Sequence, residues 1–196
     1  MSVDIKATIP APIALDAVLA TARETMAELL GLPSAPALTV FADRRYRQGR
    51  PVAEGHRLGG ADLAAATLGR RPADLGFFEI EVPLTGDRTW LNVLDYADTD
   101  EPDEDSYPLE AVFSPYRTCV GVVTAASLAL AVALRTGGAF LDDEIRMLEP
   151  AVSDPRAVIE RTRLENASAD DLATRAERYM RQFPRLSGWP RYPTTD

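Results

Sequence analysis

The sequence predicts an α+β protein in which a mostly antiparallel sheet carries helices on one face and two C-terminal helices end the fold. Three observations predict this class. Segments of alternating apolar and polar residues recur along the first half of the chain, and two of them are separated by one short turn. An uncharged run, residues 118–134, has the length of a buried helix. The last part of the chain carries two segments with helical spacing.

The spacing of apolar residues predicts the first strands and helices of the chain. Residues 3–9 are apolar at every second position and predict a strand, whereas residues 13–30 have apolar spacings of three and four and predict a helix. Residues 37–42 predict a short strand. The arginine-rich stretch 44–57 is interrupted by glycine and proline, so we expect an irregular basic loop, followed by a brief helix within residues 59–69.

The middle of the chain predicts a hairpin and a core helix. Residues 76–84 and 89–96 alternate around a turn that contains Gly86, which predicts a β-hairpin, and residues 109–113 predict a further strand. The uncharged run 118–134 is shorter than the roughly twenty residues of a membrane span and is rich in alanine. We therefore expect a fully buried helix there.

The C-terminal part predicts a short hairpin, two helices and an extended tail. Residues 139–141 and 145–148 are expected to be its strands, with an acidic turn between them. A helix capped by Ser153 is expected to reach residue 164, and Ser168 resembles the start of a capping box for a second, ending near residue 180. The predicted organisation is a core domain at 1–150, a helical pair packed on it at 151–182 and an extended aromatic and proline-rich tail at 183–196.

Composition excludes several classes of function. The chain has a formal net charge of −9, which disfavours nucleic acids and anionic membranes as partners. Its single cysteine, Cys119, excludes an internal disulfide, and the N-terminus lacks the features of a secretory signal, so a cytoplasmic location is expected. No cofactor motif or metal-binding motif is present, and hydrolase and zinc chemistry are unsupported.

Negative charge is concentrated in one segment. Between Asp74 and Glu110 there are twelve acidic side chains and one basic side chain, Arg88, so this segment carries −11. We call residues 95–107, where the carboxylates are densest, the acidic segment. Its candidate binding residues are Tyr96, Asp98, Asp100, Glu101, Asp103, Glu104, Asp105 and Tyr107. Calcium is disfavoured, because Pro102 and Asp103 occupy positions where a calcium loop needs a ligand and a glycine.

Two residues are weak candidates for catalysis. Cys119 stands at the predicted start of the buried helix, where the helix dipole and Arg117 would favour a thiolate, and His56 is the only histidine that could act as its base. The alternative is that Cys119 is a small buried side chain and His56 an unrelated loop residue. Glu79 and Glu81 alternate on one sheet face, which we expect to face solvent.

The basic loop, residues 44–57, could hold a phosphate before the helix at Gly59 and Gly60, but it lacks the lysine and hydroxyl of a phosphate-binding loop. We favour a solvated basic patch that faces the acidic segment within the fold or across an oligomer interface.

An apolar helix followed by a Gly-Gly pair, a short strand and an acidic turn, residues 122–143, resembles a segment of small α+β immunity proteins of bacterial polymorphic-toxin systems. The resemblance implies a non-enzymatic protein that blocks a basic toxin, with the acidic segment competing for the toxin's cationic site. Tyr96 and Tyr107 would supply affinity. The alternatives are a small enzyme or ligand-binding domain with a pocket near Cys119, and a homodimer formed through the terminal helices and tail.

Overall fold

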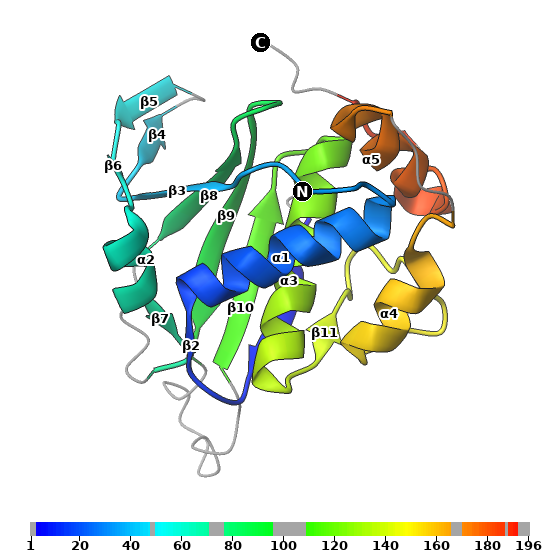
Figure 1. Cartoon of the computed structure of the whole chain (residues 1–196), viewed down its shortest axis with the longest axis horizontal. Helices are drawn as coiled ribbons and strands as arrows, with labels where there is room; N and C mark the ends of the chain where they lie inside the picture. Colours follow the sequence, from blue (N-terminus) through cyan, green and yellow to red (C-terminus); the bar gives the residue numbers. More distant parts are fainter. Residues whose placement is uncertain are drawn as a thin grey trace.

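A seven-stranded, wholly antiparallel sheet forms the centre of the fold (Figure 1). The computed structural model describes residues 3–47, 50–70, 77–95, 109–165, 170–186 and 188–191. In spatial order the strands of the sheet are β11 (Phe140–Leu141), β1 (Ile5–Ile9), β10 (Leu109–Pro115), β9 (Asp87–Leu94), β8 (Phe78–Val82), β3 (Thr39–Ala42) and β6 (His56–Arg57). The predicted α+β class with a mostly antiparallel sheet is confirmed.

The predicted hairpin is the β8–β9 pair, in which Ile80 lies opposite Thr89 and Val82 opposite Asp87. Gly86 has φ of 75°, a value that glycine adopts without the strain of a side chain, and this allows the turn. β9 then pairs with β10, with Leu94 opposite Glu110. The connection between these two strands includes the acidic segment and lies outside the described residues beyond Asp95.

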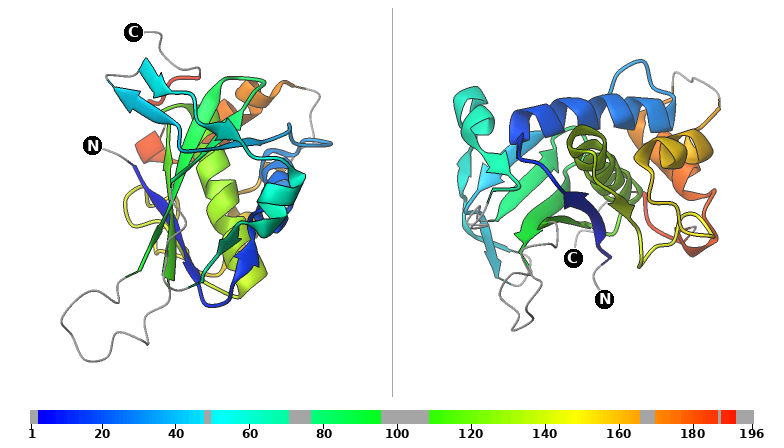
Figure 2. Two further views of the ribbon diagram at one scale, coloured as in Figure 1. Left: turned by 90° about the vertical axis from the view of Figure 1, so that its left-hand side faces the viewer. Right: turned by 90° about the horizontal axis from the view of Figure 1, so that it is seen from below.

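The helices gather on one face of the sheet (Figure 2). They are α1 (Leu15–Leu30), α2 (Gly60–Ala65), α3 (Cys119–Thr136), α4 (Pro155–Thr162) and α5 (Leu172–Met180). α3 packs on β1, β9 and β10 and on α1, α4 and α5, so it lies between the sheet and the outer helices. This position explains why its sequence is uncharged up to Leu134: fifteen of its eighteen residues are buried, and its one charged residue, Arg135, lies in the last turn.

α3 is bounded by specific caps. The Thr118 hydroxyl accepts a hydrogen bond from the Gly121 N–H at 3.0 Å, and Gly137 ends the helix with φ of 71°. By length and composition alone the helix is apolar enough to cross a bilayer. Its burial among strands and helices is that of a core helix, as predicted.

Several predicted elements were wrong in detail. The basic loop contains a small ribbon, β4 (Arg45–Arg47) with β5 (Arg50–Ala53), and it returns to the main sheet as β6. Ile13 and Ala14 form β2 rather than the first helical turn, and they pair with β7 (Thr67–Leu68).

Residues 145–148 do not form a strand. The Asp142 carboxylate accepts hydrogen bonds from the N–H groups of Ile145, Arg146 and Met147, at 2.6 to 3.1 Å, and folds this segment into a turn. Burial raises the pKa of Asp142.

The caps of the last two helices also differ from the prediction. Asp154, not Ser153, caps α4, and Asp171 caps α5, each accepting from the backbone N–H three residues on. Ser168 lies outside the described residues. The tail forms a 3₁₀ turn, η2 (Pro184–Leu186), instead of running extended throughout, and Phe183 is buried.

Candidate binding surface on the open sheet face

The two faces of the sheet differ in character because side chains alternate along each strand. Ile80, Leu91 and Phe113 point toward the helices and are fully buried. Their neighbours, among them Glu79 and Trp90, point to the opposite face, which none of the helices covers (Figure 2). We call this second side the open face.

Glu79 is the centre of a charged cluster on the open face. Its carboxylate is fully buried, and Arg44 Nη1 contacts Glu79 Oε1 at 2.6 Å. The same nitrogen contacts Glu81 Oε2 at 3.0 Å, and Arg88 Nε lies 3.6 Å from Glu79 Oε1. Glu79 and Glu81 share one face, as predicted. The expected solvent exposure of Glu79 was wrong, because two guanidinium groups and an indole enclose it.

Aromatic rings surround this cluster. Trp90 Nε1 donates a hydrogen bond to Glu79 Oε2 at 3.2 Å, and the Trp90 ring meets the edge of Tyr116 at a centroid distance of 5.2 Å. Phe77 lies 6.4 Å from Trp90 and is 43% exposed. We call Phe77, Trp90 and Tyr116 the aromatic cluster.

Arginine side chains extend the same arrangement. The Arg44 guanidinium carbon lies 3.5 Å from the ring centroid of Phe41, and that of Arg88 lies 5.8 Å from the ring centroid of Tyr116. The Glu79 carboxylate therefore holds two arginines and a tryptophan in fixed positions. Tryptophan, tyrosine and arginine are the residue types that dominate binding energy in protein interfaces.

The contacts of Glu79 within the cluster include ion pairs with two arginine cations and a hydrogen bond from an indole N–H. Among the described residues, no group of three or more potential metal-ligating side chains occurs.

The residues proposed to bind from sequence could not be placed. Tyr96, Asp98, Asp100, Glu101, Asp103, Glu104, Asp105 and Tyr107 all lie outside the described residues. The chain that bears them leaves β9 after Leu94 and re-enters at Leu109, the first residue of β10. β9 also carries Trp90 and Arg88, so the acidic segment continues from a strand of the aromatic cluster.

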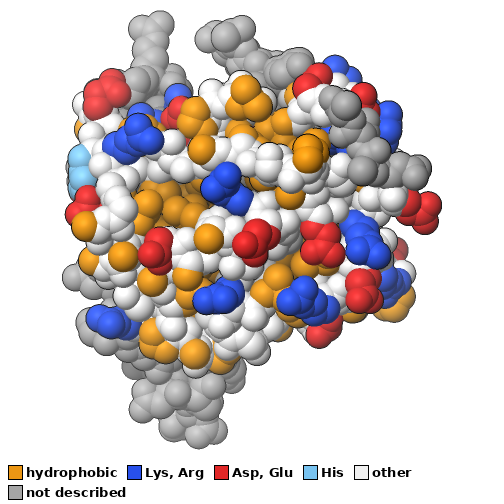
Figure 3. Space-filling view, viewed as in Figure 1, with side chains coloured by type: hydrophobic (Ala, Val, Ile, Leu, Met, Phe, Trp, Pro, Cys, Tyr) orange, Lys and Arg blue, Asp and Glu red, His pale blue; other side chains and the backbone are white. Residues whose placement is uncertain are grey.

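The structure shows where one arginine of the basic loop finds its acidic partners within the fold. Arg44, from the basic loop, binds the strand carboxylates of Glu79 and Glu81. On the helix side, acidic and basic side chains are interspersed over the visible surface (Figure 3). That side offers no surface of one sign.

Cys119 and His56 are not brought together. Cys119 is 1% exposed, with its Sγ 3.5 Å from the Trp189 carbonyl oxygen. Burial raises the pKa of the Cys119 thiol and Glu177 raises it further, which favours the alternative of a small buried side chain over a thiolate. His56 is on the edge strand β6, exposed, and 3.9 Å from Asp43.

Two cavities lie elsewhere in the fold, and neither is lined by Cys119 or His56. A cleft of about 850 Å³ lies at the C-terminal ends of α1, α4 and α5, and includes Arg161, Arg175 and Arg178. Arg175 is almost wholly buried and donates from Nε to the Leu30 carbonyl at 2.6 Å. Arg161 and Arg178 lie in the last turns of α4 and α5, where cations stabilise the helix dipole.

The second cavity, of about 200 Å³, lies beside β11 and is lined by Phe140, Asp142, Met147 and Val158, among others. The sequence did not point to either cavity. The first is assembled from α1, α4 and α5, which are separated along the chain, whereas the second is formed within residues 140–158 by the irregular turn that was predicted as a strand.

No known protein family, curated protein or solved structure matches this chain.

Proposed function

We propose that this chain is a non-enzymatic, cytoplasmic interaction protein that binds a basic protein partner, in the manner of an immunity protein that blocks a toxin. The binding surface consists of the aromatic cluster on the open sheet face together with the acidic segment. The observation that carries the proposal is the aromatic cluster, because Glu79 holds Trp90 and two arginines in place on a face that no helix covers. Preorganised aromatic anchors, combined with an anionic segment that follows the same strand in the chain, suit a cationic partner.

The two parts of the surface have different physical roles. The acidic segment acts over a distance of about one Debye length, roughly 8 to 10 Å in physiological salt, and so accelerates encounter with a cationic surface. The aromatic cluster acts only on contact, through burial of ring surface. Electrostatic changes should therefore alter the association rate, and aromatic changes the dissociation rate.

The alternative of a small enzyme with a pocket at Cys119 is less well supported. Such a pocket would bring Cys119, His56 and an arginine together, but the two residues lie on different elements and neither lines the two cavities described above.

The test begins with the genes beside the coding sequence, since an immunity protein is expected to be encoded next to its toxin. The purified product of the adjacent gene, carrying an inactivating substitution if it is toxic, is the binding probe. We expect association that weakens strongly between about 0.05 M and about 0.5 M NaCl. Absence of a basic protein among the neighbouring products, or an affinity independent of salt, would refute the proposal.

Two exposed apolar residues flank β8 and give a matched pair of variants. Phe77 is part of the aromatic cluster, whereas Leu84 is 70% exposed and stands at the opposite end of β8. Phe77→Ala should weaken binding roughly tenfold through faster dissociation, because truncating an interface anchor costs about 1 to 2 kcal/mol. Leu84→Ala should leave affinity unchanged.

The acidic segment has its own variant, in which Asp98, Asp100, Glu101, Asp103, Glu104 and Asp105 are changed together to their amides. This variant should slow association and flatten the salt dependence. Unchanged association kinetics would remove the acidic segment from the binding surface.

A further inference from the structure

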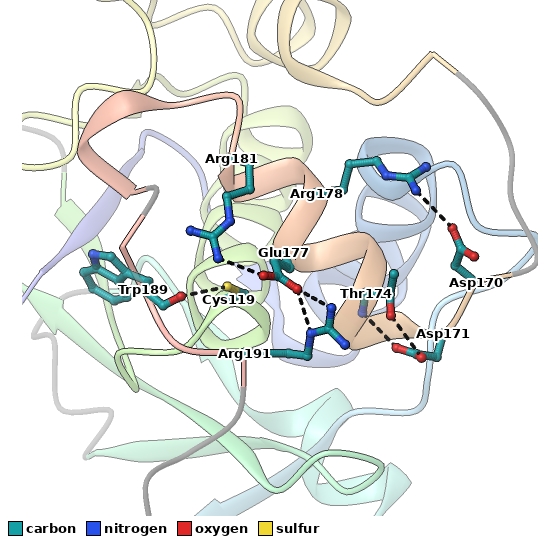
Figure 4. A network of polar contacts seen from close by, with 9 residues as sticks. All are labelled: Cys119, Asp170, Asp171, Thr174, Glu177, Arg178, Arg181, Trp189 and Arg191. Carbon is teal, nitrogen blue, oxygen red and sulfur yellow. Dashed lines mark hydrogen bonds and ion pairs between the residues drawn. The ribbon is translucent and has the colours of Figure 1, made fainter.

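The last described residues of the chain run across the N-terminus of α3 (Figure 4). We call residues 188–191 the strap. The Pro190 carbonyl accepts a hydrogen bond from the Cys119 N–H at 2.9 Å, and the Trp189 carbonyl lies 3.5 Å from Cys119 Sγ. Cys119 is the first residue of α3, so its N–H has no partner within the helix. The strap thus supplies the acceptor that the first turn of α3 lacks.

A carboxylate on α5 fixes the end of the strap. Glu177 Oε2 accepts from Arg191 Nε at 2.7 Å and from Arg191 Nη2, while Glu177 Oε1 contacts Arg181 Nη2 at 2.7 Å. Arg181, and after it Arg191, hold the pKa of Glu177 below its ordinary value. Figure 4 shows Glu177 between the two arginines, beside the buried thiol.

The strap belongs to no helix or strand, unlike the body it covers. Its attachments include the half-buried Trp189, the contacts of the Trp189 and Pro190 carbonyls with Cys119, the ion pair of Arg191 with Glu177, and a hydrogen bond from the Trp189 N–H to the Leu186 carbonyl. The body beneath it is a continuous core that includes residues of α3 and of every strand of the sheet except the edge strand β6. Segments with few attachments open locally at much lower free energy than the whole fold.

We propose that residues 188–191 form a releasable strap over the N-terminus of α3, and that its opening exposes the Cys119 thiol and N–H while the rest of the protein stays folded. The ion pair between Arg191 and Glu177 sets how often the strap opens. In the closed state Cys119 is 1% exposed, with its thiol against the Trp189 carbonyl and its N–H bonded to the Pro190 carbonyl. In the open state it lies at the start of an eighteen-residue helix, in reach of a reagent or partner.

The rate of thiol labelling by an aromatic disulfide reagent in native buffer measures this opening, because Cys119 is the only cysteine. Arg191→Gln should raise the rate roughly two- to fivefold, the range expected for loss of a partly exposed ion pair. The matched control is Arg185→Gln, which removes a surface ion pair to Glu149 three residues before the strap. Its rate should equal that of the unmodified protein.

A truncated chain that ends at residue 187 removes the strap altogether and should label on the order of tenfold faster or more. Salt should also speed labelling of the unmodified chain, since it screens the Arg191 pair, and should have no such effect on Arg191→Gln.

Two results would overturn the proposal. One is a rate for Arg191→Gln no higher than that of the control. The other is a labelling rate that rises with urea as steeply as global unfolding does, since this would show that the thiol is exposed only when the whole protein unfolds. The second measurement needs only the unmodified chain, so it holds even if the truncated form fails to fold.

Discussion

Replacement of Gly121 by alanine sets two opposing effects against each other. Gly121 is the third residue of α3, and alanine is favoured over glycine in a helix by about 1 kcal/mol. A Cβ at this position would lie 2.5 Å from the Tyr116 carbonyl oxygen and 2.9 Å from the Thr118 hydroxyl. Both distances are shorter than any ordinary carbon–oxygen contact.

The steric effect should win. The Tyr116 oxygen is main chain, and it accepts a hydrogen bond from the Thr118 N–H, so it cannot move without distorting the turn that leads into α3. The Thr118 hydroxyl is the cap of the helix and also bonds Asp87. Overpacking a filled site costs about 1 to 3 kcal/mol and loss of the cap about 1 kcal/mol. After the gain in helix propensity, we expect Gly121→Ala to destabilise the protein by about 1 to 3 kcal/mol.

Urea denaturation followed by far-ultraviolet circular dichroism measures the change. Gly60→Ala is the matched control, because Gly60 is also in the first turn of a helix but has no atom within 4 Å of where its Cβ would lie. That variant should be as stable as the unmodified protein or slightly more stable. A midpoint for Gly121→Ala equal to or above that of Gly60→Ala would refute the steric reasoning.

Three further substitutions test buried carboxylates by the same measurement. Asp87 Oδ2 is buried without a hydrogen-bond partner, and burial raises the pKa of this carboxyl group. The free-energy cost of ionising it in the folded protein is therefore absent below its unfolded pKa of about 3.9 and grows as the pH rises. Asp87→Asn should stabilise the protein by about 1 kcal/mol near pH 7, and an equally large gain near pH 3 would contradict this reasoning. Asp142→Ala should cost about 2 kcal/mol, since three backbone N–H groups lose their acceptor, and a loss below about 0.5 kcal/mol would argue against a structural role for the turn. Glu79→Gln should cost about 2 kcal/mol, because the Arg44 guanidinium then loses the buried carboxylate that it contacts at 2.6 Å. The control Glu110→Gln, at a 3.9 Å pair with Lys6, should stay within about 0.5 kcal/mol, and equal losses would show that burial of Glu79 is unimportant.

Local patterns were enough to predict the main elements. The spacing of apolar residues placed α1 and the β8–β9 hairpin, and the uncharged run placed α3 together with its glycine cap. These signals work because period and capping depend on neighbours within a few residues. Short strands such as β2 and β7 were missed, since two residues carry no period and pair only because distant segments meet.

The environment of the candidate site residues depends on contacts between residues that are distant in sequence, and the local spacing of apolar residues does not predict such contacts. Glu79 is buried because Arg44 arrives from thirty-five positions earlier in the chain. That approach follows from the pairing of β3 with β8, which places Phe41 opposite Glu79. The position of Cys119 at a helix start was predicted, but its raised pKa was not, because the strap that buries it comes from seventy residues later.

The strand pairing divides the acidic residues of the segment between positions 74 and 110, whose net charge is −11, into two groups. Glu79 and Glu81 bind Arg44, Glu110 lies 3.9 Å from Lys6, and Asp87 is buried, so these strand carboxylates are paired or enclosed within the fold. Seven of the remaining acidic residues fall between positions 95 and 105, on the connection between β9 and β10. These strand carboxylates contribute little to steering a charged partner, because a neighbouring cation balances their charge or they are buried away from the surface. Any electrostatic attraction for a basic protein must therefore come chiefly from this connection, which continues from β9, the strand that carries Trp90 of the aromatic cluster.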